Sequence, residues 1–291
     1  MPITKTRIAA AARSVLALDG RDCGFLVSAA GGDLVADVIE DRRDPSGLVR
    51  KSIGRPTLEP VTIELGFTME KPVYDWIATS WTPTIAPREA AIVQTDFDHE
   101  RIREQRYFEA VVTETTFPAL AAASKEPPVM TVRFAAETTI EAPASGPVAQ
   151  PTGTPRKTTQ SNFRFELDGL DSATVSKIDA FTVKRPLAGD PRDYSKEPAN
   201  VEFPNLRVTV NEAHGESWTD WFQRFVVQGE NSEADEKNGS IVLLATDMKT
   251  EICRVDLFNV GIFALRRRFQ PEQDEVPKLT AELYCERMQF G

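Results

Sequence analysis

Apolar and polar residues alternate in short runs along most of this chain, as expected for β-strands that bury one face. Val61, Ile63 and Leu65 alternate with Thr62 and Glu64 in one such run. The same pattern predicts strands at residues 91–95, 107–113, 129–135, 163–170, 206–210, 240–246, 255–265 and 279–286. Many short strands separated by turns are typical of an antiparallel β protein.

Two short segments follow helical spacing instead. Pro72 suits the first turn of a helix, where its missing N–H costs nothing. Tyr74, Ile77 and Trp81 then share one side at spacings of three and four. A second helix is predicted to begin at Ser217 with a capping-box-like arrangement. Each helix follows a predicted strand, so helix and strand recur in the same order.

The whole series of elements occurs twice, with matching residues about 150 positions apart. The matching pairs include Asp75-Trp76 with Asp220-Trp221, Thr95-Asp96 with Thr246-Asp247, and Phe108 with Phe258. Matching phase means matching buried faces, because a one-residue slip would turn every side chain of a strand over. We therefore predict a mainly β protein with two tandem antiparallel β-barrel or sandwich domains, each carrying one short α-helix.

The predicted domains leave two segments outside them. Residues 4–18 are Ala-rich and are expected to form an amphipathic helix that ends at Asp19-Gly20. A Pro-rich stretch without apolar periodicity indicates a semi-extended linker. The expected divisions are a helical segment 1–21, a first domain 22–141, a linker 142–161 and a second domain 162–291. Residues 41–54, inside the first domain, are polar and are expected to form an exposed loop.

The predicted strand 255–265 is apolar on both faces. Alternation places Phe258, Val260, Ile262 and Ala264 on one face and Leu257, Gly261, Phe263 and Leu265 on the other. A neighbouring domain or subunit is expected to cover the second apolar face. Three arginines follow directly and are either a charged strand end or a docking contact. The predicted assembly interface is Phe258, Val260, Phe263, Leu265, Arg266, Arg267 and Arg268.

Composition limits the classes of partner. The net charge of −10 and the pI near 4.9 argue against tight nucleic-acid binding, which needs Lys and Arg to neutralise phosphates. The three cysteines show no paired spacing and predict reduced thiols in a cytoplasmic product. The chain contains no run of about 18 apolar residues, so no membrane span is predicted.

No catalytic, cofactor or metal site is predicted. The two histidines, His99 and His214, lie in polar loops without a nucleophile motif nearby and are expected to be solvated. An acidic loop at residues 230–236 lacks the spacing of a calcium site. Trp76 and Trp221 occupy equivalent positions, which favours core packing over ligand stacking.

The ordered series of elements resembles the inner-tube proteins of phage tails and contractile injection systems. The second copy carries the resemblance in FRFELDGLDSATVSKIDAF (163–181), NLRVTVNEAHGESWTDWF (205–222), GSIVLLATD (239–247) and RVDLFNVGIF (254–263). The first copy is similar more weakly, in TLEPVTIELGFTMEKPVYDWI (57–77) and AAIVQTDF (90–97). The resemblance implies rings of six such domains around a lumen that conducts DNA or protein. The family usually has one domain per chain, so two copies leave open a tube subunit and a baseplate hub or tube-initiating ring.

The function hypothesis is a non-enzymatic structural subunit that forms a trimer with pseudo-sixfold symmetry, since three tandem chains supply six equivalent positions. Its expected partners are itself, neighbouring rings, sheath or baseplate proteins, and a cargo that passes without specific binding. We expect production in the bacterial cytoplasm and incorporation into a phage tail or injection particle. The alternative from another class is a tandem β-sandwich module that binds a carbohydrate or protein ligand.

Overall fold

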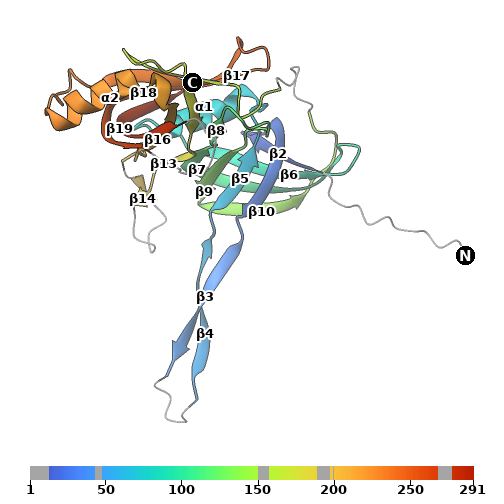
Figure 1. The fold of residues 1–291 in the computed structure, drawn as a ribbon. Helices are drawn as coiled ribbons and strands as arrows, with labels where there is room; N and C mark the ends of the chain where they lie inside the picture. The colour runs from blue at the N-terminus through green and yellow to red at the C-terminus, as the bar shows by residue number, and fades with distance from the viewer. Residues whose placement is uncertain (1–12, 43–47, 150–156, 189–196, 199, 268–276) are drawn as a thin grey trace, which may run out of the picture.

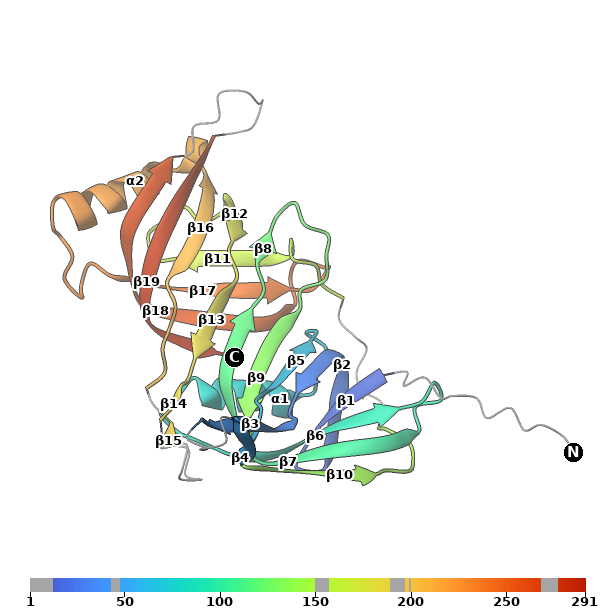
Figure 2. The ribbon, with the colours of Figure 1, turned by 90° about the horizontal axis from the view of Figure 1, so that it is seen from below.

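Two antiparallel β-barrels lie side by side, and a short helix accompanies each (Figures 1 and 2). The computed structural model describes residues 13–42, 48–149, 157–188, 197–198, 200–267 and 277–291. This architecture confirms the predicted fold class. Both predicted helices are present as α1 (Lys71–Ser80) and α2 (Glu216–Phe222).

The first barrel is closed. Its strands are β1 (Arg13–Leu18), β2 (Arg21–Gly31), β5 (Val61–Leu65), β6 (Arg88–Thr95), β7 (Arg101–Phe117) and β9 (Met130–Ala135). They pair in the order β7-β6-β1-β2-β5-β9, and β9 pairs with β7 again. β10 (Thr138–Pro143) continues the line of β9 along β7. Between β2 and β5 the chain forms a two-stranded hairpin of β3 (Leu34–Asp41) and β4 (Arg50–Leu58).

The second barrel repeats this order but stays open at one seam. Its strands are β11 (Phe163–Leu167), β12 (Val175–Ile178), β16 (Leu206–Asn211), β17 (Lys237–Leu244), β18 (Glu251–Arg267) and β19 (Lys278–Phe290). They pair in the order β11-β17-β18-β19-β16-β12. Between β12 and β16 lie β13 (Phe181–Lys184), β14 (Leu187–Ala188) and β15 (Glu197–Pro198). β8 (Leu120–Ala121), from the first half of the chain, pairs with β12 at the seam.

The expected N-terminal helix is wrong over residues 13–18, which form β1; residues 4–12 lie outside the described residues. Asp19 and Gly20 both have positive φ, 50° and 78°, and make the two-residue turn that joins β1 to β2. The strand lacks alternation because it is buried on both faces. Leu16 and Leu18 belong to the main core, whereas Val15 and Ala17 pack in a second cluster. The first barrel therefore begins at β1 rather than at residue 22.

The start of α2 differs in detail from the expectation. Gly215, not Ser217, occupies the N-cap position, without a side-chain capping bond. The Ser217 hydroxyl instead accepts a hydrogen bond from the Asp171 backbone N–H. The helix continues into a π-helical turn over Gln223–Val227.

The two longest strands, β7 and β18, show the duplication in their backbone. Each has 17 residues and contains one non-glycine residue with positive φ, Glu109 at 52° and Asn259 at 54°. In the turn before each strand an aspartate side chain, Asp96 or Asp247, accepts two backbone N–H bonds. The two copies therefore share local distortions as well as element order.

The left-handed residue corrects the predicted faces of residues 255–265. A positive φ inserts a bulge and shifts the phase of the strand. Leu257 is buried before Asn259, and Val260 and Ile262 are buried after it. Strict alternation would place Leu257 and Val260 on opposite faces, so the predicted faces are wrong.

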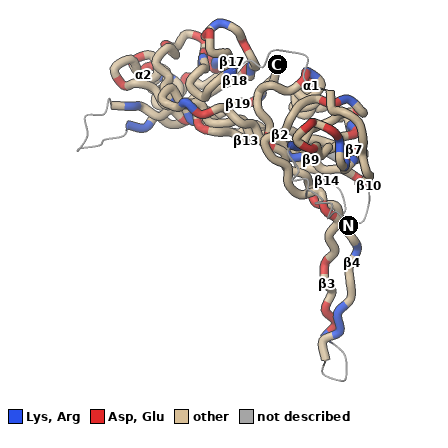
Figure 3. Tube along the Cα trace, turned by 90° about the vertical axis from the view of Figure 1, so that its right-hand side faces the viewer, with Lys and Arg blue, Asp and Glu red and all other residues tan. Residues whose placement is uncertain are grey.

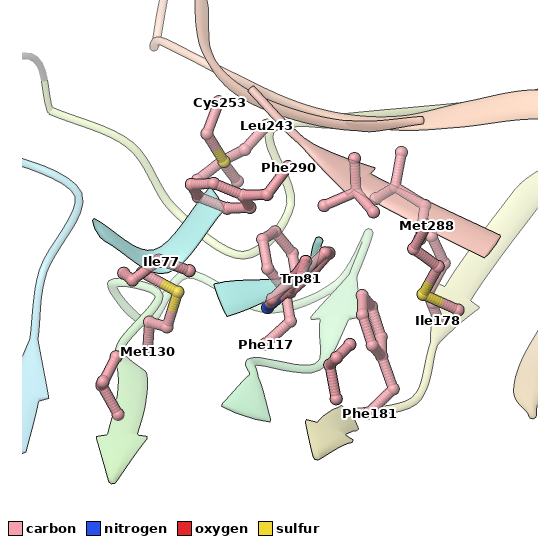
Figure 4. Close-up of a cluster of buried hydrophobic side chains, with 14 of the residues drawn as sticks. Ile77, Trp81, Phe117, Met130, Ile178, Phe181, Leu243, Cys253, Met288 and Phe290 are labelled. Atoms are coloured by element: carbon pink, nitrogen blue, oxygen red, sulfur yellow. The ribbon is translucent and has the colours of Figure 1, made fainter. Parts of the chain in front are cut away.

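The cores of the two copies merge into one cluster of buried residues (Figure 4). Ile77, Trp81 and Phe117 of the first copy face Phe181 and Phe290 of the second. The rings of Trp81 and Phe290 lie 5.5 Å apart, edge to face. Trp76 and Trp221 are buried in this cluster, so their predicted role in core packing is confirmed.

The Pro-rich stretch 142–161 stays a predicted linker, and its described ends are attached to the barrels. Val148 is buried beside β1, and the Ala149 backbone N–H donates to the Asp22 carboxylate at 2.8 Å. On the other side the Thr158 hydroxyl donates to the Leu244 carbonyl at 2.6 Å.

The three thiols should be unreactive in the folded chain. Cys23, Cys253 and Cys285 are free and buried. Burial raises the pKa of all three, that of Cys285 to about 11. Because the thiolate is the reactive form, iodoacetamide at pH 8 should alkylate Cys285 roughly 100-fold more slowly in the native chain than in the urea-unfolded chain. Mass spectrometry of timed samples measures both rates, and equal rates would contradict the burial.

Among the described residues, no helix combines the length and the apolar character needed to cross a membrane.

Candidate assembly surfaces

Strand β13 of the second copy is added to β7 of the first copy. Phe181 pairs with Phe117 and Val183 with Thr115, in antiparallel register. The Arg185 backbone N–H extends the pairing by donating to the Thr113 carbonyl at 2.7 Å. The joint between the barrels is therefore partly a shared sheet.

Side chains reinforce this joint. The rings of Phe117 and Phe181 stack at 5.3 Å with an interplanar angle of 16°. Beside them the hydroxyls of Thr116 and Thr182 share a hydrogen bond of 2.8 Å. Apolar stacking and a polar bond thus hold the same pair of strands.

The guanidinium of Arg185 binds the segment that follows α1. It donates to the carbonyl oxygens of Ser80, Pro83 and Thr84 at 3.3, 2.9 and 2.9 Å. The residue is 4% exposed, and burial lowers the pKa of its side chain. An unpaired buried cation is costly, so the three carbonyls compensate for its desolvation.

β14 and β15 of the second copy correspond to the β3–β4 hairpin of the first. Lys184 pairs with Glu202 in the second copy as Val35 pairs with Thr57 in the first. Leu187 likewise pairs with Pro198 as Val38 pairs with Ile53. β13 is therefore the counterpart of the start of β3. In the second copy this start is paired with the other barrel, whereas in the first copy it is not.

The β3–β4 hairpin projects away from the first barrel (Figure 1). Its apolar residues are exposed on both faces, with Leu34 at 67% and Ile53 at 78%. β3 carries acidic side chains and β4 basic ones (Figure 3). The loop expected over residues 41–54 is indeed exposed, but its described part includes the ends of a hairpin. Such apolar exposure makes the hairpin a candidate docking surface.

The end of β18 offers a free sheet edge. Its pairing with β17 stops at Val260, and no described strand pairs with residues 261–267 on that side. Phe263 is 42% exposed there, and Leu265 is packed partly against the core.

Basic residues at the end of β18 are already tied to acidic neighbours. Arg266 and Arg267 form ion pairs with Glu282 at 3.0 Å and Glu212 at 3.2 Å. The hydrogen bond from Arg266 lowers the pKa of Glu282. Both arginine side chains remain more than half exposed.

The predicted interface residues do not all lie on this edge. Val260 is 0% exposed and belongs to the core of its own barrel. Phe258 is half-buried, and the Arg287 guanidinium covers its ring at 3.7 Å. Arg268 lies outside the described residues. Phe263, Leu265, Arg266 and Arg267 are brought together at the strand end. The exposed apolar residues of the β3–β4 hairpin were not among the predicted interface residues.

On the side of β2 that faces β1, no described strand pairs with the residues after Phe25. A cleft of about 500 Å³ is lined by Arg13, Phe25, Ser28 and Thr68, among others. In the second copy, β8 pairs along the corresponding part of β12, where the Ala122 backbone N–H donates to the Ser176 carbonyl at 2.9 Å. Among the described residues, the first copy has no counterpart of β8 at this place.

The other candidate chemistry has structural explanations. His214 is exposed, and His99 lies 5.2 Å from the Phe25 ring in a left-handed turn. In the acidic loop, Glu236 accepts hydrogen bonds from the Tyr284 hydroxyl and the Asn259 amide. Within the described part of the chain, no group of three or more His, Cys, Asp or Glu residues could hold a metal ion.

Comparison with known proteins gives one family match. Residues 35–139 match the model of the T4-like virus tail tube protein gp19. No curated protein matches the chain.

Solved structures give similarities over about half of the chain. One is a protein of the PVC sheath–tube complex, an extracellular contractile injection system in its extended state. It has a TM-score of 0.42 and 21% identity, and the alignment covers 48% of this chain and 95% of that one. The tube-terminating cap of the anti-feeding prophage has a TM-score of 0.40 and 25% identity, and the alignment covers 50% of this chain and 100% of that one. Hcp1 from Flavobacterium johnsoniae has a TM-score of 0.29 and 14% identity, covering 44% and 94%.

Proposed function

We propose that the chain, which belongs to the T4-like tail tube protein gp19 family, is a structural subunit that assembles into rings of a phage tail or contractile injection-system tube. The family is structural and the chain is not an enzyme. Three chains would supply six barrels around one lumen, with true threefold and approximate sixfold symmetry.

The observation that carries this proposal is the unequal use of equivalent surfaces in the two copies. The β13 region of the second copy is paired with the first barrel. The outer edge of β3 in the first copy and the corresponding edge of β18 pair with no strand among the described residues. Two different free surfaces at opposite ends of a tandem make a head-to-tail contact, and such contacts close into rings when the rotation permits.

The wider assembly follows from the family and the charge. The proposed partners are further rings and the sheath or baseplate proteins of the same particle. A net charge of −10 suits a conduit through which DNA passes without binding, because like charges repel. A protein cargo is equally compatible with the barrel architecture. We propose assembly from a bacterial cytoplasmic pool into the tail or injection particle.

The fusion of two copies also favours a hub or tube-initiating ring. Fusion fixes the order of two neighbouring barrels and raises their effective concentration, which lowers the cost of nucleating a ring. A repeating tube subunit is present in many copies per particle, whereas an initiator is present as one ring. Quantitative mass spectrometry of purified particles separates the two roles.

Mass photometry of the purified chain tests the ring. We expect a species of three times 32.3 kDa or its multiples, and negative-stain images of closed rings. Phe263→Asp should give a folded chain that does not assemble. Phe97→Asp is the matched control, because Phe97 is 73% exposed in a turn away from the β18 edge. A well-folded monomer at high concentration would contradict the proposal and favour a tandem binding module.

A further inference from the structure

The joint between the two barrels of one chain is a template for a joint between two chains. We infer that residues 33–36 of one chain pair antiparallel with residues 263–266 of a second copy, as β13 pairs with β7 within the chain. This inference rests on the proposed function, because it specifies the contact that would close the ring. The occupant of both free surfaces is therefore the chain itself.

The correspondence of the acceptor strands is fixed residue by residue. Val112 pairs with Phe134 in the first copy as Ile262 pairs with Leu283 in the second. Glu114 likewise pairs with Arg133 as Ala264 pairs with Glu282. Both pairs of strands have a register shift at the same place, just before Glu114 and Ala264. The end of β18 therefore presents the same backbone geometry as the end of β7. Thr113 corresponds to Phe263 and Phe117 to Arg267.

The donor strands correspond on either side of a short divergent segment, in which Gly31 and Gly32 have positive φ whereas the residues at the same positions of the second copy do not. The pairing of β2 with β5 and that of β12 with β16 contain the same register shift. Leu26 pairs with Leu65 as Val175 pairs with Val210, and Ser28 pairs with Glu64 as Lys177 pairs with Thr209. Continuing along both copies, Leu34 corresponds to Val183 and Ala36 to Arg185. The hairpin pairings beyond this point remain matched.

The backbone groups of the hairpin point in the required directions. The Glu59 N–H donates to the Asp33 carbonyl at 2.9 Å. In an antiparallel pair such bonds recur at every second residue, so Val35 also faces β4. The N–H and C=O groups of Leu34 and Ala36 then face the outer edge of β3, where no described strand lies. In the inferred pairing they exchange hydrogen bonds with the outward N–H and C=O groups of Phe263 and Leu265, just as the Arg185 N–H donates to the Thr113 carbonyl within the chain.

The facing side chains are complementary in the inferred register. Leu34 lies opposite Leu265 and Val35 opposite Ala264, so exposed apolar surface is covered. Asp33 lies opposite Arg266, an acid against a base. Main-chain bonds would supply affinity and these side chains the register, as in other cases of strand addition.

Engineered disulfides test the register in the full-length chain. Val35 and Ala264 would form a pair without direct backbone bonds, which brings Cα atoms to roughly 4.5 Å and suits a disulfide. Val35→Cys with Ala264→Cys in one chain should give covalent trimers on non-reducing gels under mild oxidation. Mixing the two single variants should give covalent dimers and nothing larger. Glu114→Cys with Lys184→Cys is the equivalent pair within the chain. It should form an intramolecular disulfide and run as a monomer on the non-reducing gel.

The controls separate this inference from the proposed ring. Val38→Cys with Ala264→Cys moves one thiol by about 10 Å along β3 and should give no covalent trimer. Closed rings in micrographs without the Val35–Ala264 disulfide would overturn the inferred pairing and leave the ring proposal standing. Covalent ladders without closed rings would support the pairing and overturn the ring. Equal cross-linking by the Val38 control would overturn the register.

Discussion

Replacing Phe117 with alanine should lower the free energy of unfolding by about 3–5 kcal/mol, the usual cost of truncating a fully buried phenylalanine. Phe117 is fully buried at the end of β7. Its ring stacks on Phe181 at 5.3 Å and meets Phe67 edge to face at 5.7 Å. The substitution would remove apolar contacts from both barrels at once and leave a cavity between them.

The expected transition is a single one, because the buried residues of both copies form one cluster. Urea unfolding followed by tryptophan fluorescence measures it, since Trp76, Trp81, Trp218 and Trp221 are all buried. Phe97→Ala is the control, being the same truncation at a side chain 73% exposed, and should change stability by about 0.5 kcal/mol or less. Two separate transitions in the unmodified chain, with Phe117→Ala affecting only one, would show that the barrels are energetically independent.

The sequence predicts the parts of this fold that bury one face of a strand. β5 has the predicted bounds of residues 61–65, because Val61, Ile63 and Leu65 face the core while Thr62 and Glu64 do not. α1 begins one residue before Pro72, as proline at the first turn predicts. The matching pairs about 150 residues apart also identify strands that have the same register in the structure.

β1 could have been found from the sequence by a different signal. Leu18-Asp19-Gly20 repeats as Leu167-Asp168-Gly169 after β11, and Gly20 and Gly169 have similar φ angles of 78° and 72°. Alternation fails at β1 because it is buried on both faces. The duplicated turn survives because only a left-handed backbone closes it.

The candidate assembly surfaces were harder to predict, for two physical reasons. Asn259 adopts a left-handed conformation that no sequence pattern near it demands, so the buried faces of β18 change phase without warning. The β3–β4 hairpin is exposed on both faces, which erases the contrast between apolar and polar positions. Both surfaces become recognisable only when each copy is compared with the other in register.

Replacing Arg185 with alanine should lower the free energy of unfolding by about 2–4 kcal/mol. A hydrogen bond to a charged group contributes roughly 1.5–3 kcal/mol net, and burying a cation that is bonded only to carbonyl groups offsets part of the sum over three bonds. The change leaves the carbonyls of Ser80, Pro83 and Thr84 without this donor in a partly buried site. It also loosens the attachment of β13 to β7. Arg185→Lys should recover part of the loss, because a lysine keeps the charge but lacks the planar fork of donors.

Urea unfolding and hydrogen exchange at β13 measure the effect, and exchange should accelerate first in residues 181–184. Arg164→Ala is the matched control. Arg164 makes ion pairs with Glu166 and Glu251 on the surface, and such pairs contribute about 1 kcal/mol or less. Equal losses for the two variants would show that burial of Arg185 adds nothing. In the first copy Ala36 takes the place of Arg185, so the inferred joint between chains lacks this buried contact. We therefore expect the barrels to separate between chains at lower urea concentrations than those that separate them within a chain.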